Sequence, residues 1–143
     1  MKDLTKNEKL LIDEIKIIQD VIKRMADNSF KIKGWTVTLI VITLIFKGKS
    51  NANHLLAFLP LISFWILDTY YLRMERIYRA LYAWVIKNRP TSNEYLFDLN
   101  PKRFEGEVDG YLKTMFSISL RMFYGGLLIM LLFISCLDLL GGS

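Results

Sequence analysis

The uneven distribution of apolar residues is the feature that most constrains the fold of this chain. Apolar residues make up 52% of the 143 residues and concentrate in three windows, at 35–46, 55–72 and 115–140. The third window exceeds the roughly 20 apolar residues that a membrane-spanning helix needs, and the first two reach that length only with interfacial neighbours. A chain this short cannot build a soluble shell around three such helices. We therefore predict an all-α integral membrane protein, with soluble core helices as the alternative for the first two windows.

The polar segments between the windows predict the topology. Residues 47–54 are polar and turn-rich, so the first two windows are expected to form a transmembrane hairpin. The second helix is expected to continue to about residue 87, followed by a loop or short helices at 91–110. The residues at 28–34 predict a hinge or bend. The four predicted units are a cytoplasmic amphipathic helix, a transmembrane hairpin, a cytoplasmic helix with its loop, and a third transmembrane helix, at 1–30, 31–72, 73–112 and 113–140.

An apolar seam runs along the first predicted helix, with its members spaced 4, 3, 4 and 3 residues apart. This spacing is typical of a helix that buries one face against a partner. The opposite face carries both acids and bases, whereas a helix that lies on a membrane surface carries mostly Lys and Arg. We therefore predict that the seam mediates assembly of several copies, with a membrane-surface helix as the alternative. The seam consists of Leu11, Ile15, Ile18, Ile22 and Met25.

Positive charge is distributed unevenly between the predicted loops. Eight Lys and Arg residues precede Trp35, another eight lie between Arg73 and Lys113, and the hairpin loop holds only Lys47 and Lys49. Lys and Arg are enriched in the cytoplasmic loops of membrane proteins. We therefore predict an inner-membrane protein with the N-terminus and the segment after the hairpin in the cytoplasm.

Asp68 is a carboxylate at the edge of the second apolar window, where an unpaired charge is costly. With a hairpin turn near residue 51, Lys33 lies 18 residues before the turn (51 − 33) and Asp68 lies 17 residues after it (68 − 51). At about 1.5 Å per residue the two lie at nearly the same depth. Pairing with Lys33, or with Arg73 of a neighbouring copy, would avoid the several kcal/mol that a lone carboxylate costs. A solvated interfacial Asp68 and an ion-conducting Asp68 are the alternatives.

A run of arginines follows Asp68 at a spacing of three residues: Arg73, Arg76 and Arg79. Such a run is typical of a helix anchored to anionic headgroups. Alternatively, it forms a ring of positive charge at the cytoplasmic mouth of an assembly, able to hold phosphates or RNA. We predict that Lys33, Asp68, Arg73 and Arg76 form a charged layer at the membrane edge.

Four aromatic residues are also expected near the cytoplasmic interface. Trp35 and Trp65 lie at similar depths by the same count, and Tyr70 and Tyr71 follow close by. Together they are typical of an aromatic belt at a membrane surface. Core packing inside the hairpin is the alternative for Trp65.

Residues that carry out catalysis or bind metals are sparse. A single cysteine, Cys136, and a single histidine, His54, exclude an intrachain disulfide and a histidine-rich metal site. The chain has no glycine-rich phosphate loop, and His54 falls on the predicted outer loop, away from any Ser-His-Asp set. The neighbouring carboxylates Asp13 and Glu14 are interpreted as solvated surface groups. We therefore expect no enzyme and no cofactor.

Three stretches of sequence, in this order, carry a resemblance to small bacterial multi-pass membrane proteins: RMADNSF, KIKGWTVTLIVITL and LPLISFWILDTYYLRMERIYRALY. They resemble the RipA-type octameric membrane proteins and the transmembrane effectors associated with nucleotide-signalling and CRISPR defence systems. The resemblance covers residues 15–85 and is architectural. It implies a homo-oligomer in the bacterial inner membrane that permeabilises or depolarises that membrane when infection is sensed, as an antiphage-defence effector.

The expected partners follow from this assignment. They are the lipid bilayer, further copies of the chain, and, as candidate activators, a cytoplasmic defence protein or a nucleotide or RNA signal. DNA is not an expected partner, because the positive charge is accounted for by Lys and Arg next to a membrane. A non-catalytic membrane anchor or scaffold that recruits a cytoplasmic partner is the alternative function.

A homo-oligomer is expected, because small and hydroxylated residues in the short spans favour helix contacts over lipid contacts, and association relieves the mismatch of short helices with the bilayer. These residues are Thr36, Thr38, Thr43, Ser63, Gly125 and Gly126. The mass of the protein in mild detergent, measured by light scattering, should exceed that of one chain. A monomeric mass would refute the prediction.

Overall fold

The computed structural model describes residues 5–46, 56–89, 91–92 and 94–141, except the side chains of 138, 139 and 141. Within these ranges all regular structure is helical, which confirms the all-α fold class. The helices, in chain order, are α1 (Lys6–Ile45), α3 (Phe58–Asn88), η1 (Pro101–Phe104), α4 (Tyr111–Met115) and α5 (Ile118–Gly141). The predicted hairpin loop lies outside the described residues.

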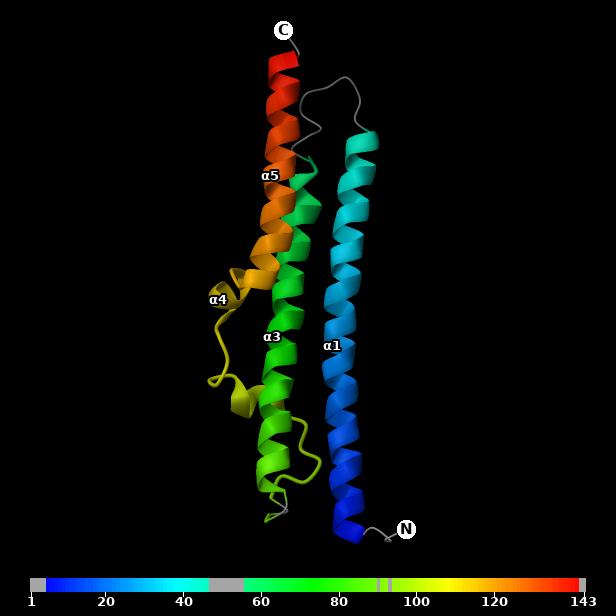
Figure 1. Cartoon of the computed structure of the whole chain (residues 1–143), viewed down its shortest axis with the longest axis vertical. Coiled ribbons are helices and arrows are strands. Elements are labelled where there is room, and N and C mark those ends of the chain that lie inside the picture. Colours follow the sequence, from blue (N-terminus) through cyan, green and yellow to red (C-terminus); the bar gives the residue numbers. More distant parts are fainter. Residues whose placement is uncertain (1–4, 47–55, 90, 93, 142–143) are drawn as a thin grey trace.

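The two longest helices, α1 and α3, form an antiparallel pair, and α5 packs beside one half of α3 (Figure 1). At 40 residues, α1 is about 60 Å long. It begins at a capping box, in which Thr5 and Glu8 bond to each other's backbone N–H groups. The second long helix ends at Asn88, close to the predicted residue 87, and the following segment contains the short helix η1, as expected.

No break interrupts α1 at 28–34, where the sequence predicted a hinge or bend. The boundary predicted after residue 30 therefore falls within one continuous helix. Ser29 is buried and turns its hydroxyl toward α3, so it does not cap a helix end. Gly34 lies on the exposed side of α1, where the cost of about 1 kcal/mol for glycine in a helix is outweighed by packing along the rest of the helix.

The apolar seam of α1 is covered by α3 of the same chain. Ile18 is fully buried in a cluster with Ile77, Leu81 and Val85, and it is accompanied by three other seam residues, Leu11, Ile15 and Ile22. Met25 is half-buried at the end of the seam. Because the antiparallel pair holds α3 beside α1, the seam is buried without a second copy of the chain. Assembly of copies through this helix stays a prediction.

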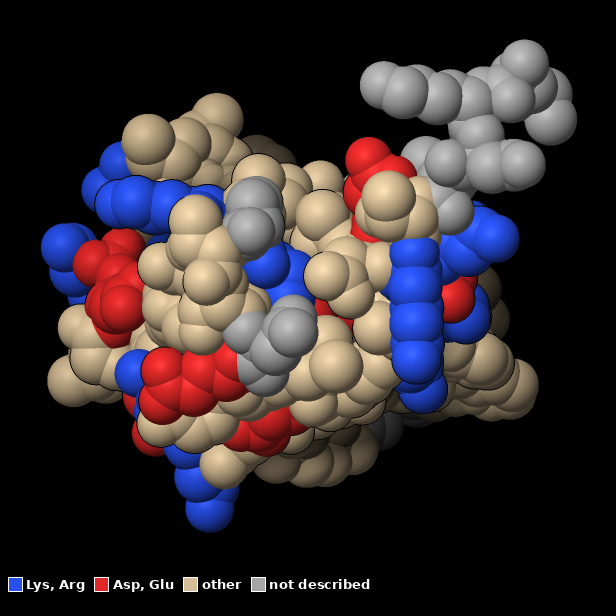
Figure 2. All heavy atoms as spheres, turned by 90° about the horizontal axis from the view of Figure 1, so that it is seen from below, with Lys and Arg blue, Asp and Glu red and all other residues tan. Residues whose placement is uncertain are grey.

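The two ends of the helical pair differ in the chemistry of their surfaces. Acidic and basic side chains intermix over the end that contains the N-terminus, which we call the charged end (Figure 2). Toward the other end, the apolar end, large hydrophobic side chains are exposed on each of the three long helices. They include Trp35, Val41 and Ile45 on α1, Leu59, Ile62 and Ile66 on α3, and Met122, Ile129 and Phe133 on α5.

One helix in the described part of the chain is long and apolar enough to cross a membrane. It is α5, over Ile118–Leu137, and only 17% of its most apolar window is buried inside the protein. Soluble core helices are mostly buried, so this exposure is unlike theirs. The finding is weak support for a membrane location, and α1 and α3 do not pass the same test over their described residues.

The burial of the seam within one chain gives a stability prediction. Replacing the fully buried Ile18 by Ala should lower the free energy of unfolding by about 2–5 kcal/mol, because it leaves a cavity between α1 and α3. The adjacent Ile17, which is 40% exposed, is the matched control, and Ile17→Ala should cost less than about 1 kcal/mol. Denaturant titration in mild detergent measures both, and equal losses would contradict the packing.

Candidate functional site

Asp68 lies on α3 at the centre of a buried polar cluster and is wholly inaccessible to solvent. From α1, the Ser29 hydroxyl donates to Oδ1, and the Lys33 ammonium donates to Oδ2 over 2.6 Å. From α5, the Tyr124 hydroxyl donates to Oδ2 over 3.1 Å. A second bond of 2.8 Å from Lys33 Nζ to Ser29 Oγ closes the network. This Asp68 cluster therefore joins all three long helices through one carboxylate.

The surroundings of the cluster fix its donors in place. The Tyr124 ring stacks on Trp65, with centroids 5.6 Å apart and an interplanar angle of 4°, and meets Phe123 edge-on. Lys33 keeps 22% of its side chain exposed, and its ammonium lies 6.0 Å from the Phe123 ring centroid. A buried ionised carboxylate costs several kcal/mol unless it is paired and hydrogen-bonded. Three donors and one positive charge meet that requirement here.

The pairing of Asp68 with Lys33, predicted from their equal depth, is confirmed, and the solvated alternative does not fit a carboxylate with 0% exposure. Two members of the cluster, Ser29 and Tyr124, were not predicted. Ser29 lies one helical turn before Lys33 on the same face, so its position relative to Lys33 was a usable signal. Tyr124 carried no such signal, because its register depends on the turns between α3 and α5.

The predicted charged layer divides into two parts. Arg73 does not approach Asp68 within the chain: its guanidinium donates to the backbone oxygens of Asp109 and Glu105, over 3.2 and 3.3 Å. Its Cζ also lies 4.6 Å from the Tyr111 ring centroid, and the residue is only 9% exposed. Arg76 pairs with the Asp109 carboxylate at 3.4 Å. The two arginines therefore fasten the segment before α4 to α3, while Lys33 and Asp68 form a separate pair.

The predicted aromatic belt is also divided. Trp35 is 60% exposed and Tyr70 43% exposed, as an interfacial position requires, and Tyr71 is half-buried with its ring against Tyr70. Trp65 instead packs inside, where its indole N–H donates to the Met115 carbonyl over 3.1 Å. Trp65 therefore packs in the protein, but its contacts are with Met115, Phe116 and Tyr124 on the α5 side of α3 and not inside the hairpin, as the alternative expected.

A second buried ion pair lies at the charged end. Arg89, just after α3, donates through Nε and one terminal nitrogen to the two carboxylate oxygens of Glu14, both at 2.6 Å. The side chains are only 4% and 1% exposed. The interpretation of Glu14 as a solvated group was wrong. Glu14 falls three residues after Leu11 and four before Ile18, which places it on the buried seam, whereas Asp13 stays exposed.

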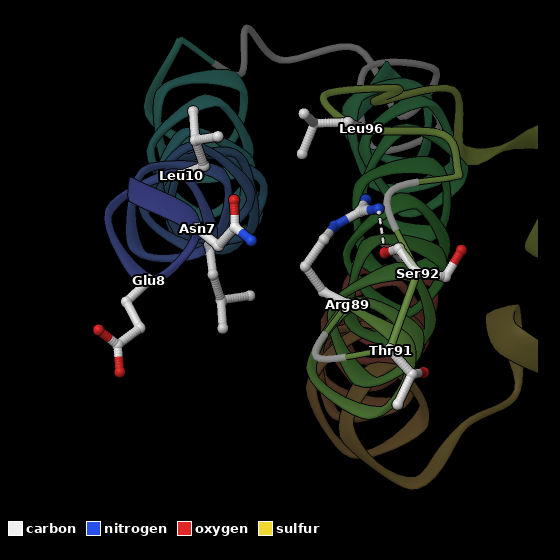
Figure 3. Close-up of a pocket in the computed structure, with 8 residues that line it drawn as sticks. Asn7, Glu8, Leu10, Arg89, Thr91, Ser92 and Leu96 are labelled. Carbon is white, nitrogen blue, oxygen red and sulfur yellow. Dashed lines mark hydrogen bonds between the residues drawn. The ribbon is translucent and has the colours of Figure 1, made fainter. Parts of the chain in front are cut away.

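The pocket beside this pair, of about 410 Å³, opens between the start of α1 and the segment after α3 (Figure 3). Asn7 and Leu10 face Arg89 and Ser92 across it. The guanidinium has five N–H donors, and five protein acceptors occupy its three nitrogens: both Glu14 oxygens and the carbonyls of Ser92, Glu94 and Tyr95. It therefore has no donor left for an anion, and its role is to hold the chain after α3 against α1.

No protein-family model, curated protein or solved structure matches the chain. The arrangement of its own side chains therefore carries the functional argument.

Removal of one partner of the Glu14–Arg89 pair should destabilise the fold strongly. Glu14→Gln keeps the size of the side chain but leaves a buried guanidinium without its counter-charge, so we expect a loss of about 3–5 kcal/mol in the free energy of unfolding. Asp13→Asn, the neighbouring control, removes an exposed carboxylate 4.0 Å from Lys16 and should cost less than about 1 kcal/mol. Thermal unfolding in detergent compares the two, and similar midpoints would show that the pair is dispensable.

Proposed function

We propose that this chain is an integral membrane protein of the bacterial inner membrane that acts as a homo-oligomer and permeabilises the bilayer. The apolar end lies in the bilayer and the charged end in the cytoplasm. Support comes from the large hydrophobic side chains exposed on all three long helices at the apolar end. Exposure of this extent is unfavourable in water and favourable in lipid. The sixteen Lys and Arg residues before residue 35 and between 73 and 113 support the cytoplasmic orientation.

The single observation that carries the proposal is the position of the Asp68 cluster along α5. Tyr124 lies six residues into the candidate span (124 − 118), about 9 Å from its start. With α5 in the bilayer, Asp68 and Lys33 lie inside the edge of the hydrocarbon region. Ionisable groups at such a depth are costly and are typical of ion or proton pathways. Water would therefore enter between copies at this level, next to Lys33, which keeps 22% of its side chain exposed.

The role as an antiphage-defence effector is proposed on the resemblance of residues 15–85 to defence-associated membrane proteins. A defence effector that perforates its own membrane must remain closed until it is activated. The Asp68 cluster suits a closed state, because each of its charges has a partner within one protomer. A nucleotide, RNA or protein signal that acts on the charged end is the proposed activator.

A membrane anchor that recruits a cytoplasmic partner is the second candidate. This function is favoured by the complete hydrogen bonding of Asp68. A carboxylate that accepts from three donors and is not exposed to solvent needs no role other than to hold α1, α3 and α5 together. In that case the charged end, which is held together by the buried Glu14–Arg89 pair, presents the partner-binding surface.

The two candidates are separated by Asp68→Asn in liposomes loaded with a fluorescent dye. The amide preserves size but removes the charge and leaves Lys33 unpaired, so the pore proposal expects altered leakage with the oligomer preserved. Asp20→Asn, an exposed position on α1, is the control and should leak like the wild type. Leakage that is unchanged by Asp68→Asn supports the anchor. A silent wild type does not, because the pore proposal expects a closed protomer until it is activated or the Asp68 cluster is disrupted. Loss of the oligomer would show that the carboxylate is a structural clamp.

A further inference from the structure

A ledge projects from the side of the bundle at the level where α5 begins (Figure 1). We use this name for residues 109–122, which comprise α4, the turn after it and the first turn of α5. The ledge exposes five large hydrophobic side chains within twelve residues: Tyr111, Leu112, Phe116, Ile118 and Met122. Leu112 is 76% exposed and Ile118 73%. A patch of this kind on a protein surface marks a contact with another molecule or with lipid.

The outward direction of these side chains is fixed by contacts on the inner side of the ledge. Thr114 and Leu120 are fully buried. The Trp65 indole donates to the Met115 carbonyl over 3.1 Å and meets the Phe116 ring edge-on, with centroids 5.8 Å apart. At the other end, Arg73 holds the backbone of residues 105 and 109 and packs against Tyr111. The exposed side chains therefore belong to a docked segment.

Two cations accompany the apolar side chains. Lys113 has 78% of its side chain exposed and pairs with Asp109 at 2.7 Å, a hydrogen bond that lowers the pKa of that carboxyl. Arg121 is exposed, and no side chain in the described part of the chain bonds to its guanidinium. Long basic side chains next to exposed leucine and aromatic groups are typical of segments that lie in the headgroup region of a bilayer.

We propose that the ledge docks on anionic phospholipids at the cytoplasmic surface of the bilayer. Leu112, Phe116 and Ile118 insert among the upper acyl chains, while Lys113 and Arg121 bind headgroup phosphates. The inference rests on the proposed membrane location and deepens it by naming the depth of the ledge and the class of lipid. The ledge is continuous with the lipid-facing side of α5, and its charge complements an anionic surface. A second copy presents the same ledge, with Lys113 and Arg121 against Asp109, so it offers these two cations less negative charge than an anionic lipid surface does.

The depth of the ledge can be measured with the full chain in vesicles of phosphatidylcholine and phosphatidylglycerol. In a Cys136→Ser background, a fluorophore is attached at Leu112→Cys, at Glu107→Cys on the preceding loop, or at Phe133→Cys within α5. Nitroxides placed high on the acyl chain should quench the label at 112 more than deep nitroxides do. The label at 107 should respond only to a quencher in water, and the label at 133 to the deep nitroxide.

The pattern of quenching separates the two proposals. If the label at 133 is quenched by lipid while the label at 112 responds only to the aqueous quencher, the ledge is not in the interface although the span stands. If neither label is quenched by lipid, the membrane location itself is wrong. Quenching at 112 by the upper nitroxide supports the ledge. The ledge proposal would be overturned if the label at 112 is not quenched by lipid and two copies of the unlabelled Leu112→Cys variant instead form a disulfide cross-link.

The preference for anionic lipid is tested with Lys113→Gln and Arg121→Gln. Spin-labelled phosphatidylglycerol should associate with the protein more strongly than spin-labelled phosphatidylcholine, and the ratio should fall about fivefold for each cation removed. Lys9→Gln and Lys102→Gln, two exposed cations at the charged end, are the matched controls and should leave the ratio unchanged. An equal fall in the controls, or no fall in the ledge variants, would overturn the assignment of these headgroup ligands.

Discussion

One buried carboxylate, Asp68, determines how the three long helices meet. Its oxygens accept hydrogen bonds from Ser29 and Lys33 on α1 and from Tyr124 on α5. A shift of any helix by one residue turns its side chains by about 100° and moves the donor away from the carboxylate. Apolar contacts tolerate such shifts far better than a buried charge does. The register of the bundle therefore depends on this cluster, above all for α5, which buries few other side chains.

A second ionic contact, between Glu14 and Arg89, performs the same task at the charged end. Glu14 and Ser29 are fifteen residues apart on α1, about 22 Å along the helix axis. Between the two contacts lies the apolar cluster around Ile18 and Ile77. The long pair is thus fixed in register at two separated points, with non-directional packing between them. One ionic contact thus lies at the charged end and the other nearer the apolar end, so the register is fixed in both parts of the molecule.

The sequence predicted those contacts whose partners are related by simple geometry. The Lys33–Asp68 pair follows from counting residues on either side of a hairpin turn, because both helices rise by the same amount per residue. The Glu14–Arg89 pair was missed because Glu14 stands beside the exposed Asp13 and because Arg89 lies beyond the periodic part of α3. Tyr124 could not be predicted, since irregular turns precede α5 and no periodicity passes through them. Helix type and the end of α3 were therefore accessible, while the continuity of α1 through 28–34 and the register of α5 were not.

The strengths of the contacts at Asp68 differ between its two neighbouring helices. α1 supplies the ammonium of Lys33 and the hydroxyl of Ser29, whereas α5 supplies only the hydroxyl of Tyr124, at the longer distance of 3.1 Å. All three bonds to the carboxylate are charge-assisted, but only Lys33 brings a positive charge, and the single Tyr124 O–H also faces the Phe64 carbonyl at 3.2 Å. The contacts at Asp68 therefore hold α5 less strongly than α1. After a separation of α5 from the cluster, Asp68 would keep its counter-charge but face the space that α5 had filled.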